Sequence, residues 1–545
     1  MTKVSLKHIL FAFILNVALF AQAQNIQVDA SKSGEKFDHY WSKMVGAGRA
    51  NEALRAGWLE QMEQVQEHCG FEYVRFHGLF HDDMFPVVEE RGKISYNWQY
   101  IDDVFDRLLD MNVKPFVELA FLPTSMAAKD SKTVFWWKAN ITPDESKFNE
   151  WHDLMKAFTQ HCVDRYGIDE VLTWYFEVWN EPNLYQLFWD GTKSQYFELY
   201  KQSVLAVKSV DNRLKVGGPS TSNFVPDARF KGEVINDKVS EAVFNVEDIN
   251  TLDWEGVWIE DFLKYCEKEN LPVDFVSCHP YPTDYAFNPE TGKGRGLTRA
   301  VNSTKLDLEW LNKTIAKSAF PDIEIHLTEW NTSPSSRDPM HDRLPAAAYI
   351  VKTNLDCIGL TNSLAFWTFT DIFEEKGGAS SIFHGGFGMI NYQGLEKPSY
   401  HAYRMLNQLG DKKIYKDDYL FVSKKSKTNK VVALAYNYPK EYEDAVPSGS
   451  NKREDGSNKT LDFSLTGLKA GTLFEIEILD KDHGNIHSFW EDMGEPEPPT
   501  REQIKVMDAY ANTMKTDYIK ADKNGVLKIK QEITPWSLVL IKQIN

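Results

Sequence analysis

Two glutamates that end β-rich runs are the residues of this sequence best suited to catalysis. Glu181 lies in an Asn-Glu-Pro triplet at the end of the apolar run 174–182, and Glu329 lies in Thr-Glu-Trp at the end of the alternating run 323–331. Pro182 cannot donate to a sheet, so we expect the first strand to end there. Two carboxyl groups that face each other can cleave a glycosidic bond, one as acid and base and the other as nucleophile.

The residues around Glu181 fit the part of the acid. A carboxyl group that stays protonated near neutral pH needs a partly apolar setting, which Phe176 and Trp179 can provide. Asn180 supplies an amide suited to a sugar hydroxyl. Glu177 competes for the role, but it lies deeper in the apolar run, so we interpret it as a buried structural carboxylate. The alternative is that Glu181 has a structural role only and forms a salt bridge at the end of its strand.

The chain between residues 41 and 410 alternates β-rich runs with amphipathic helical stretches, which is typical of parallel βαβ units. Eight strands are predicted and fit a (β/α)8 TIM barrel, an α/β fold whose active site lies at the carboxyl ends of the strands. Strands four and seven would carry Glu181 and Glu329 on opposite sides of the mouth. A doubly wound sheet is the alternative, but no GxGxxG turn follows the first strand. The eight runs are Lys43–Gly48, Tyr73–Gly78, Lys114–Phe121, Trp174–Pro182, Lys215–Ser220, Asp274–Pro282, Ile323–Asn331 and Ser363–Asp371.

Other segments lie outside this alternation. Two insertions, Leu122–Asp144 with Trp136-Trp137 and Thr221–Glu255, follow strands three and five and should shape the pocket. The tryptophan pair is equally expected to form a platform for a sugar ring or to pack within the loop. Residues 411–545 hold short strands with turn-rich connections, which predicts an all-β sandwich domain, and residues 24–40 precede the barrel with a strand at Asn25–Asp29 that can join it.

Composition narrows the class of ligand and the compartment. Residues 1–23 read as a signal peptide, with Lys3 and Lys7 before an apolar run and Ala21-Gln-Ala23 at the cut, so we expect a periplasmic or extracellular protein. The net charge of −18 disfavours nucleic acid and anionic membranes as partners. Sixteen tryptophans suit stacking on sugar rings, although composition alone favours a large core with a few surface aromatics. The five cysteines show no metal spacing and are expected to be buried thiols.

Several motifs along nearly the whole mature chain resemble glycoside hydrolase family 39, in its β-xylosidase branch. The resemblance implies a retaining β-glycosidase that needs no cofactor, acts on an oligosaccharide or glycoside, and leaves association into oligomers open. The segments that carry it are Val74-Arg-Phe-His-Gly-Leu-Phe-His-Asp-Asp83, 114–123, Asn180-Glu-Pro-Asn183 with Phe188-Trp189, Leu214-Lys-Val-Gly-Gly-Pro219, Phe275-Val-Ser-Cys-His-Pro-Tyr281, Phe366-Trp-Thr-Phe-Thr-Asp371, Phe373-Glu-Glu375, 383–388 and Trp490-Glu-Asp-Met-Gly494.

The resemblance also implies roles for single residues. Glu181 matches the acid/base and Glu329 the nucleophile. Asn180 matches an amide that contacts the sugar 2-hydroxyl, and Tyr281 is placed to hydrogen-bond the nucleophile. The other implied substrate-binding residues are His77, His279, Trp367 and one of the pair Glu374 and Glu375.

Alternatives stay open at this point. The Pro-Tyr that follows His279 differs from the xylosidase pattern, so the sugar could instead be an arabinoside, a galactoside or a uronide, as in an α-L-iduronidase. A barrel that binds sugar without cleaving it is a second class. The cluster of His77, His81, Asp82 and Asp83 lacks a third spaced set of ligands, so we predict no metal site. Arg75, buried by its strand position, is expected to pair with carboxylates.

Overall fold

Eight parallel strands close into a barrel, in the order that the sequence predicts. The computed structural model describes residues 26–91, 93–184, 186–222, 230–231, 241–242, 258–284, 297–444, 446–447 and 454–545. Around the barrel each strand is hydrogen-bonded to the next, and the last closes on the first. The strands are β3 (Met44–Arg49), β4 (Tyr73–His77), β7 (Lys114–Leu119), β10 (Tyr175–Val178), β11 (Lys215–Ser222), β14 (Phe275–His279), β17 (Glu324–Trp330) and β18 (Ser363–Phe366).

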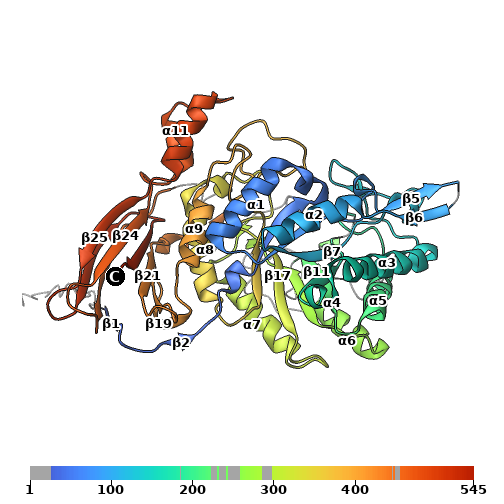
Figure 1. Cartoon of the computed structure of the whole chain (residues 1–545), viewed down its shortest axis with the longest axis horizontal. Coiled ribbons are helices and arrows are strands. Elements are labelled where there is room, and N and C mark those ends of the chain that lie inside the picture. Colours follow the sequence, from blue (N-terminus) through green and yellow to red (C-terminus); the bar gives the residue numbers. More distant parts are fainter. Residues whose placement is uncertain are drawn as a thin grey trace, which may run out of the picture.

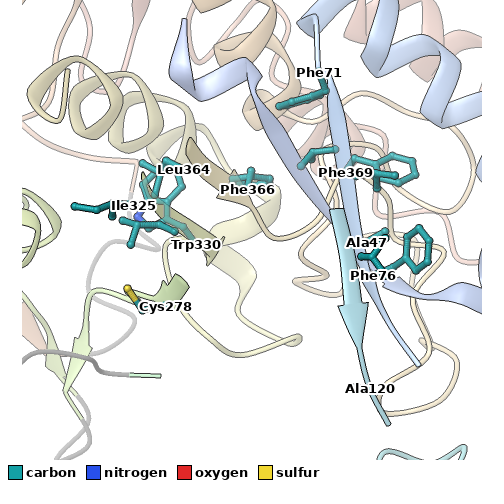
Figure 2. Packing of buried hydrophobic residues seen from close by; sticks show 14 of the residues in the cluster. Ala47, Phe71, Phe76, Ala120, Cys278, Ile325, Trp330, Leu364, Phe366 and Phe369 are labelled. Carbon is teal, nitrogen blue, oxygen red and sulfur yellow. The ribbon is translucent and has the colours of Figure 1, made fainter. Parts of the chain in front are cut away.

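Helices surround the barrel and bury its outer face. Apolar side chains on the outside of the strands pack against them, and Figure 2 shows Ile325, Trp330 and Leu364 of β17 and β18 in this core. All five cysteines are free and buried, which confirms that prediction. The helices are α1 (Ala56–Cys69), α2 (Gln99–Asp110), α3 (Phe148–Tyr166), α4 (Ile168–Val171), α5 (Lys193–Val210), α6 (Trp258–Glu269), α7 (Ser303–Ile315), α8 (Leu344–Asp356) and α9 (Pro398–Asn407).

The barrel interior is filled in layers because alternate residues of each strand point inward. The layer at the amino ends is aromatic and includes Tyr73, Phe116, Tyr175 and Phe275. In β4, β7 and β10 the next inward-facing residues, two positions after the aromatic ones, are Arg75, Glu118 and Glu177, and all three are buried. A closed apolar floor thus supports a layer of charged side chains, and the barrel mouth lies above that layer.

A β-sandwich formed mainly by the C-terminal part of the chain packs against the barrel. Its larger sheet has the order β2-β19-β20-β21-β27-β24-β25 and its smaller sheet the order β1-β23-β26. In Figure 1 the larger sheet lies to the left, and α8 and α9 separate it from the barrel strands. The strands are β1 (Ile26–Asp29), β2 (Glu35–Lys36), β19 (Lys412–Lys416), β20 (Leu420–Lys424), β21 (Val431–Tyr436), β23 (Lys459–Thr466), β24 (Leu473–Leu479), β25 (Lys515–Lys520), β26 (Leu527–Ile533) and β27 (Leu538–Gln543).

Both faces of the larger sheet are buried, which explains its continuous apolar strands. In β21, Val431 and Ala433 pack in the core shared with the smaller sheet, whereas Val432 and Leu434 pack in the barrel's core. β1 pairs with β23, as predicted for the N-terminal strand. The prediction of an all-β region was incomplete, because two helices, α10 (Ile486–Asp492) and α11 (Arg501–Ala511), lie between β24 and β25.

Short hairpins and pairs complete the described part. The insertion after β7 forms the hairpin β8 (Thr133–Val134) and β9 (Ala139–Asn140). The others are β5 (Val87–Glu90) with β6 (Lys93–Tyr96), β12 (Phe230–Lys231) with β13 (Glu241–Ala242), and β15 (Thr283–Asp284) with β16 (Leu297–Thr298), which also pairs with β22 (Val446–Pro447).

Some segments predicted from the sequence lie outside the described residues. These are the signal peptide 1–23 and most of the insertion Thr221–Glu255, of which Thr221 and Ser222 end β11. The domain boundaries also stay a prediction. Among the described residues, none of the helices combines the length and apolarity needed to span a bilayer.

Candidate active site

Glu181 lies in the turn after β10, a few residues beyond the hydrogen-bonded strand. The sequence predicted a strand to Pro182, but β10 ends at Val178. Trp179 and Glu181 have positive φ angles of 73° and 42°, so the chain leaves the extended conformation there. The backbone N–H of Glu181 donates to Ser220 O over 2.8 Å, which anchors the turn to β11. The carboxyl group is thereby held at the barrel mouth.

Glu329 faces the interior because β17 is irregular at this point. The register between β17 and β18 shifts between Leu327 and Trp330. A bulge allows two consecutive side chains to point to one face. Thr328 and Glu329 accordingly both reach interior partners, Thr328 by donating to Glu177 over 2.7 Å and Glu329 by accepting from Arg75 over 2.7 Å.

The two predicted catalytic carboxyl groups meet. One oxygen of Glu181 and one of Glu329 lie within 4.8 Å of each other and of a ring nitrogen of His279. Both glutamates are buried, with 6% and 5% of their surface exposed. Retaining glycosidases place their carboxyl groups about 5–5.5 Å apart and inverting ones about 6.5–9.5 Å apart. The pair therefore has the short spacing of a double displacement, not the wider one with which an inverting pair admits a water beside the sugar.

A single guanidinium lies below the pair. Arg75 is fully buried, and its nitrogens lie 2.7 Å from an oxygen of Glu118 and 2.7 Å from one of Glu329, with Glu177 at 2.5 Å. This confirms the predicted pairing of Arg75 with carboxylates and places Glu177 beneath the site as a structural partner. One positive charge cannot balance three anions, so the layer favours the retention of a proton.

The hydrogen bonds of His279 assign a proton to Glu181. Burial and the positive charge of Arg75 hold the pKa of His279 well below its ordinary value, so the ring is neutral. Thr328 donates its hydroxyl proton to Glu177, so it accepts from His279 Nε2, 3.0 Å away. A neutral ring protonated at Nε2 has a bare Nδ1. That atom lies 3.0 Å from Glu181 Oε1, and the hydrogen bond requires Glu181 to donate.

The environments of the two glutamates favour different protonation states. Burial raises the pKa of Glu181 well above its usual value, and the charge of Glu329 raises it further. Burial also raises the pKa of Glu329, but the charge of Arg75 opposes this. Tyr281 donates to Glu329 Oε2 over 3.0 Å, and Arg75 donates to Oε1. Hydrogen bonds to both oxygens favour the carboxylate, so Glu329 is the ionised member of the pair.

Three more predicted residues lie around the pair. His77 is neutral, because burial lowers its pKa to about 3, and its Nδ1 lies 2.7 Å from Glu118, which leaves Nε2 able to accept from a sugar hydroxyl. The Trp367 ring is 4.8 Å from that of His77 and forms part of the cavity wall. Asn180 accepts from Arg75 through Oδ1, while its buried Nδ2 has no hydrogen-bond partner among the described residues.

The structure separates the two adjacent glutamates after β18. Glu374 accepts from Arg49 over 3.0 Å and pairs with Arg55 at 2.6 Å; burial acts to raise its pKa, but the two arginines outweigh it and lower that pKa. Glu375 lines the cavity, and an oxygen of its carboxyl group lies 3.7 Å from His77 Nε2. Burial and the charge of Glu329 raise the pKa of Glu375 well above its usual value. Glu375 is therefore the member of the pair placed to meet a sugar.

These side chains open into a cavity of about 490 Å³ at the carboxyl ends of the strands. The insertion Leu122–Asp144 was predicted to shape the pocket, and its Phe135 lines the cavity; sequence reasoning missed Leu184 and Leu187 after Glu181, and Phe387. Apolar residues in loops look like ordinary packing residues in a sequence, so no pattern identified them. Trp137 stacks on Phe135, with ring centroids 5.0 Å apart, as loop packing.

The side chains of the loop after β4 have partners within the protein. His81 pairs with Asp83 at 2.7 Å, and Asp82 accepts from the Thr124 backbone N–H over 3.1 Å. Within the described ranges, the residues close enough to share an ion are Glu181, His279 and Glu329. A cation there would lie beside the Arg75 guanidinium, so the site suits proton transfer better than metal binding.

Comparison with known proteins identifies the family. The model for glycosyl hydrolases family 39 matches residues 24–242 and 251–526. The chain belongs to this family. A β-xylosidase of Caldicellulosiruptor saccharolyticus is 35% identical over 522 residues, 95% of each chain, and one of Geobacillus stearothermophilus is 34% identical over 94% of this chain and 95% of the other.

A solved structure supports the same assignment. The crystal structure of a monomeric β-xylosidase from Caulobacter crescentus CB15 is similar with a TM-score of 0.82 and 31% identity, over 95% of this chain and 98% of that one. Family 39 enzymes retain the anomeric configuration, and this chain is a retaining glycosyl hydrolase. The short separation of Glu181 and Glu329 fits that chemistry.

Proposed function

We propose that the protein is an exported β-xylosidase in which Glu329 is the nucleophile and Glu181 the acid and base. The observation that carries the catalytic assignment is the buried pair within 4.8 Å, one carboxyl group donating to a neutral His279 and the other accepting from Arg75 and Tyr281. The choice of xylose rests on the β-xylosidases that share 35% and 34% identity with the whole chain.

The proposed reaction is a double displacement. Glu329 attacks the anomeric carbon while Glu181 gives its proton to the departing oxygen. Forming the glycosyl ester removes the charge of Glu329, which is one cause of the raised pKa of Glu181. That pKa therefore falls, and Glu181 takes a proton from the water that attacks the ester. His77, Asn180 and Glu375 are placed to bind the sugar hydroxyls.

A panel of p-nitrophenyl glycosides tests the sugar, with β-xyloside, arabinoside, galactoside and glucuronide as members. We expect the β-xyloside to be cleaved fastest and proton NMR to show β-xylose as the first product. Glu329→Gln should bind the sugar without cleaving it. Another preferred glycoside would replace xylose in the proposal. Release of the α-anomer first would contradict the mechanism, and sugar binding by an inert wild type would indicate a non-catalytic barrel.

Export is proposed from the N-terminal pattern of two lysines, an apolar run and Ala21-Gln-Ala23. Expression of the full chain in a bacterial host with a secretion pathway should yield a protein whose sequence starts at Gln24. Recovery of the uncleaved chain in the cytoplasm would contradict this part of the proposal and leave the catalytic part untouched.

A further inference from the structure

The cavity has two chemically different ends. Its polar end carries His77, Glu329 and Glu375, with His77 Nε2 lying 3.6 Å from Glu329 and 3.7 Å from Glu375. Its other end carries Leu184, Leu187 and Phe188, which we call the leucine wall. Besides the catalytic pair and the polar-end residues, the described polar side chains of the lining are Tyr281, which donates to Glu329, Lys376, which follows Glu375 in the chain, and Ser222.

The leucine wall follows Glu181, the proposed acid, directly in the sequence. Leu184 N–H donates to Glu181 O over 3.0 Å, and Phe188 N–H donates to Leu184 O over 3.0 Å, so the wall is a tight turn that starts at the acid/base. Phe135 lies between the two ends, with its ring 5.5 Å from that of His77 and 5.7 Å from that of Phe188. Phe135 is therefore a neighbour of both the polar end and the leucine wall.

The acid must reach the glycosidic oxygen, which joins the sugar to its leaving group. With the sugar held at the polar end, the leaving group lies on the side of Glu181 where the leucine wall stands. Leu187 is 51% exposed and Leu184 and Phe188 are half-buried, so the wall presents apolar surface to an incoming group. A second sugar would need several hydrogen-bond partners there, and an apolar group needs none.

We propose that the leaving-group site is built for an apolar aglycone, an alkyl or aryl group, in preference to a second sugar. The inference rests on the proposed function and deepens it, because it names the class of substrate. Leu187 is its specificity-determining residue, since it is the most exposed of the three side chains and covering it removes the most apolar surface from water.

Ethyl and n-hexyl β-xylosides test the proposal, because their leaving alcohols are equally basic and differ only in apolar length. Each buried methylene is worth up to about fourfold in kcat/KM. With part of the chain in contact, we expect wild type to favour the hexyl glycoside by about tenfold, and Leu187→Ser to reduce that ratio about fivefold. Leu205→Ser removes a similarly exposed leucine, 43% against 51%, from α5, outside the cavity lining, and should change neither the ratio nor the rates.

Xylobiose separates the two kinds of leaving group. Leu187→Ser should lower kcat/KM for xylobiose by less than about twofold, because a polar ring gains little from a leucine. A hexyl-to-ethyl ratio near one in wild type, or equal losses on xylobiose and hexyl xyloside, would overturn the inference. If every xyloside is inert, the choice of xylose fails instead, and the same alkyl pair is then made on the sugar that the glycoside panel identifies.

Discussion

Gly46 of β3 gives Trp367 the space to line the sugar site, and Gly46→Ala should take that space away. A Cβ built at Gly46 would lie 2.3 Å from Trp367 Cε3 and 3.0 Å from Cζ3. Carbon atoms pack at about 3.5–4.0 Å, so the indole must move by more than about 1 Å. The backbone cannot follow easily, because Trp367 N–H donates to Trp330 O over 2.8 Å and Asn331 Nδ2 donates to Trp367 O.

The displaced ring moves away from Gly46, and its packing against the His77 ring, 4.8 Å away, changes with it. A misplacement of about 1 Å at a substrate-positioning group can cost about 100-fold in rate. Overpacking of this kind costs about 1–3 kcal/mol in stability, which a large barrel survives. We therefore expect kcat/KM for an aryl β-xyloside to fall about 100-fold in a protein that still folds and melts cooperatively.

Gly57→Ala is the matched control, because its new Cβ would lie 3.4 Å from Ile372 Cδ1, an ordinary contact. Gly57 belongs to α1, where alanine is favoured over glycine by about 0.5–1 kcal/mol. This variant should keep full activity with an unchanged or slightly higher melting temperature. If Gly46→Ala retained activity within threefold of wild type, the reasoning about Trp367 would be refuted.

Other substitutions test the remaining assignments. Glu181→Ala should lower kcat/KM for alkyl xylosides by about 10²–10⁴-fold and for substrates with acidic leaving groups far less, and azide should restore turnover with retention, as steady-state rates and NMR of the product would show. In wild type, activity should fall as pH rises through the raised pKa of Glu181, so the alkaline limb should lie above the ordinary glutamate range. Glu375→Gln should raise KM or lower kcat at least tenfold, whereas Glu374→Gln should act mainly on the melting temperature, because Glu374 pairs with two arginines. Burial raises the pKa of Glu52 to about 8, so wild type loses stability as pH rises from the unfolded value near 4.3 toward 8, and Glu52→Gln should raise the melting temperature at pH 9 and change it little at pH 5.

The sequence was sufficient for the features that depend on short patterns. The β-rich runs are confirmed as the eight barrel strands, because parallel strands buried on both faces read as apolar runs. Glu181 and Glu329 were found because a polar residue at the end of such a run stands out. The ends of the strands were less accurate. The residues Trp174–Pro182 do not predict the positive φ angles of Trp179 and Glu181 that follow the end of β10. The turn is held by a contact with β11, the hydrogen bond from Glu181 N–H to Ser220 O, which a local pattern does not show.

Features that depend on contacts across the barrel could not be predicted. The choice between Glu374 and Glu375 follows from Arg49 and Arg55, which lie more than 300 residues earlier in the chain. The helices α10 and α11 escaped notice because they interrupt a region whose strands set the expectation of an all-β fold. The leucine wall was missed because Leu184 and Leu187 form no periodic pattern.

The layer of charged side chains formed by Arg75, Glu118 and Glu177 explains how one barrel could hold the predicted acid and nucleophile side by side. A guanidinium that paired only with Glu118 and Glu177 would leave the buried Glu329 without a positive charge, and both predicted catalytic carboxyl groups would tend to stay protonated. The guanidinium, which contacts Glu118, Glu177 and Glu329, instead donates to the predicted nucleophile from below. Thr328 donates to Glu177 and must therefore accept from His279 Nε2. The same buried carboxylate therefore helps to fix the proton on Glu181, although Glu177 is absent from the cavity wall. Asymmetry between two chemically identical side chains arises one layer beneath them.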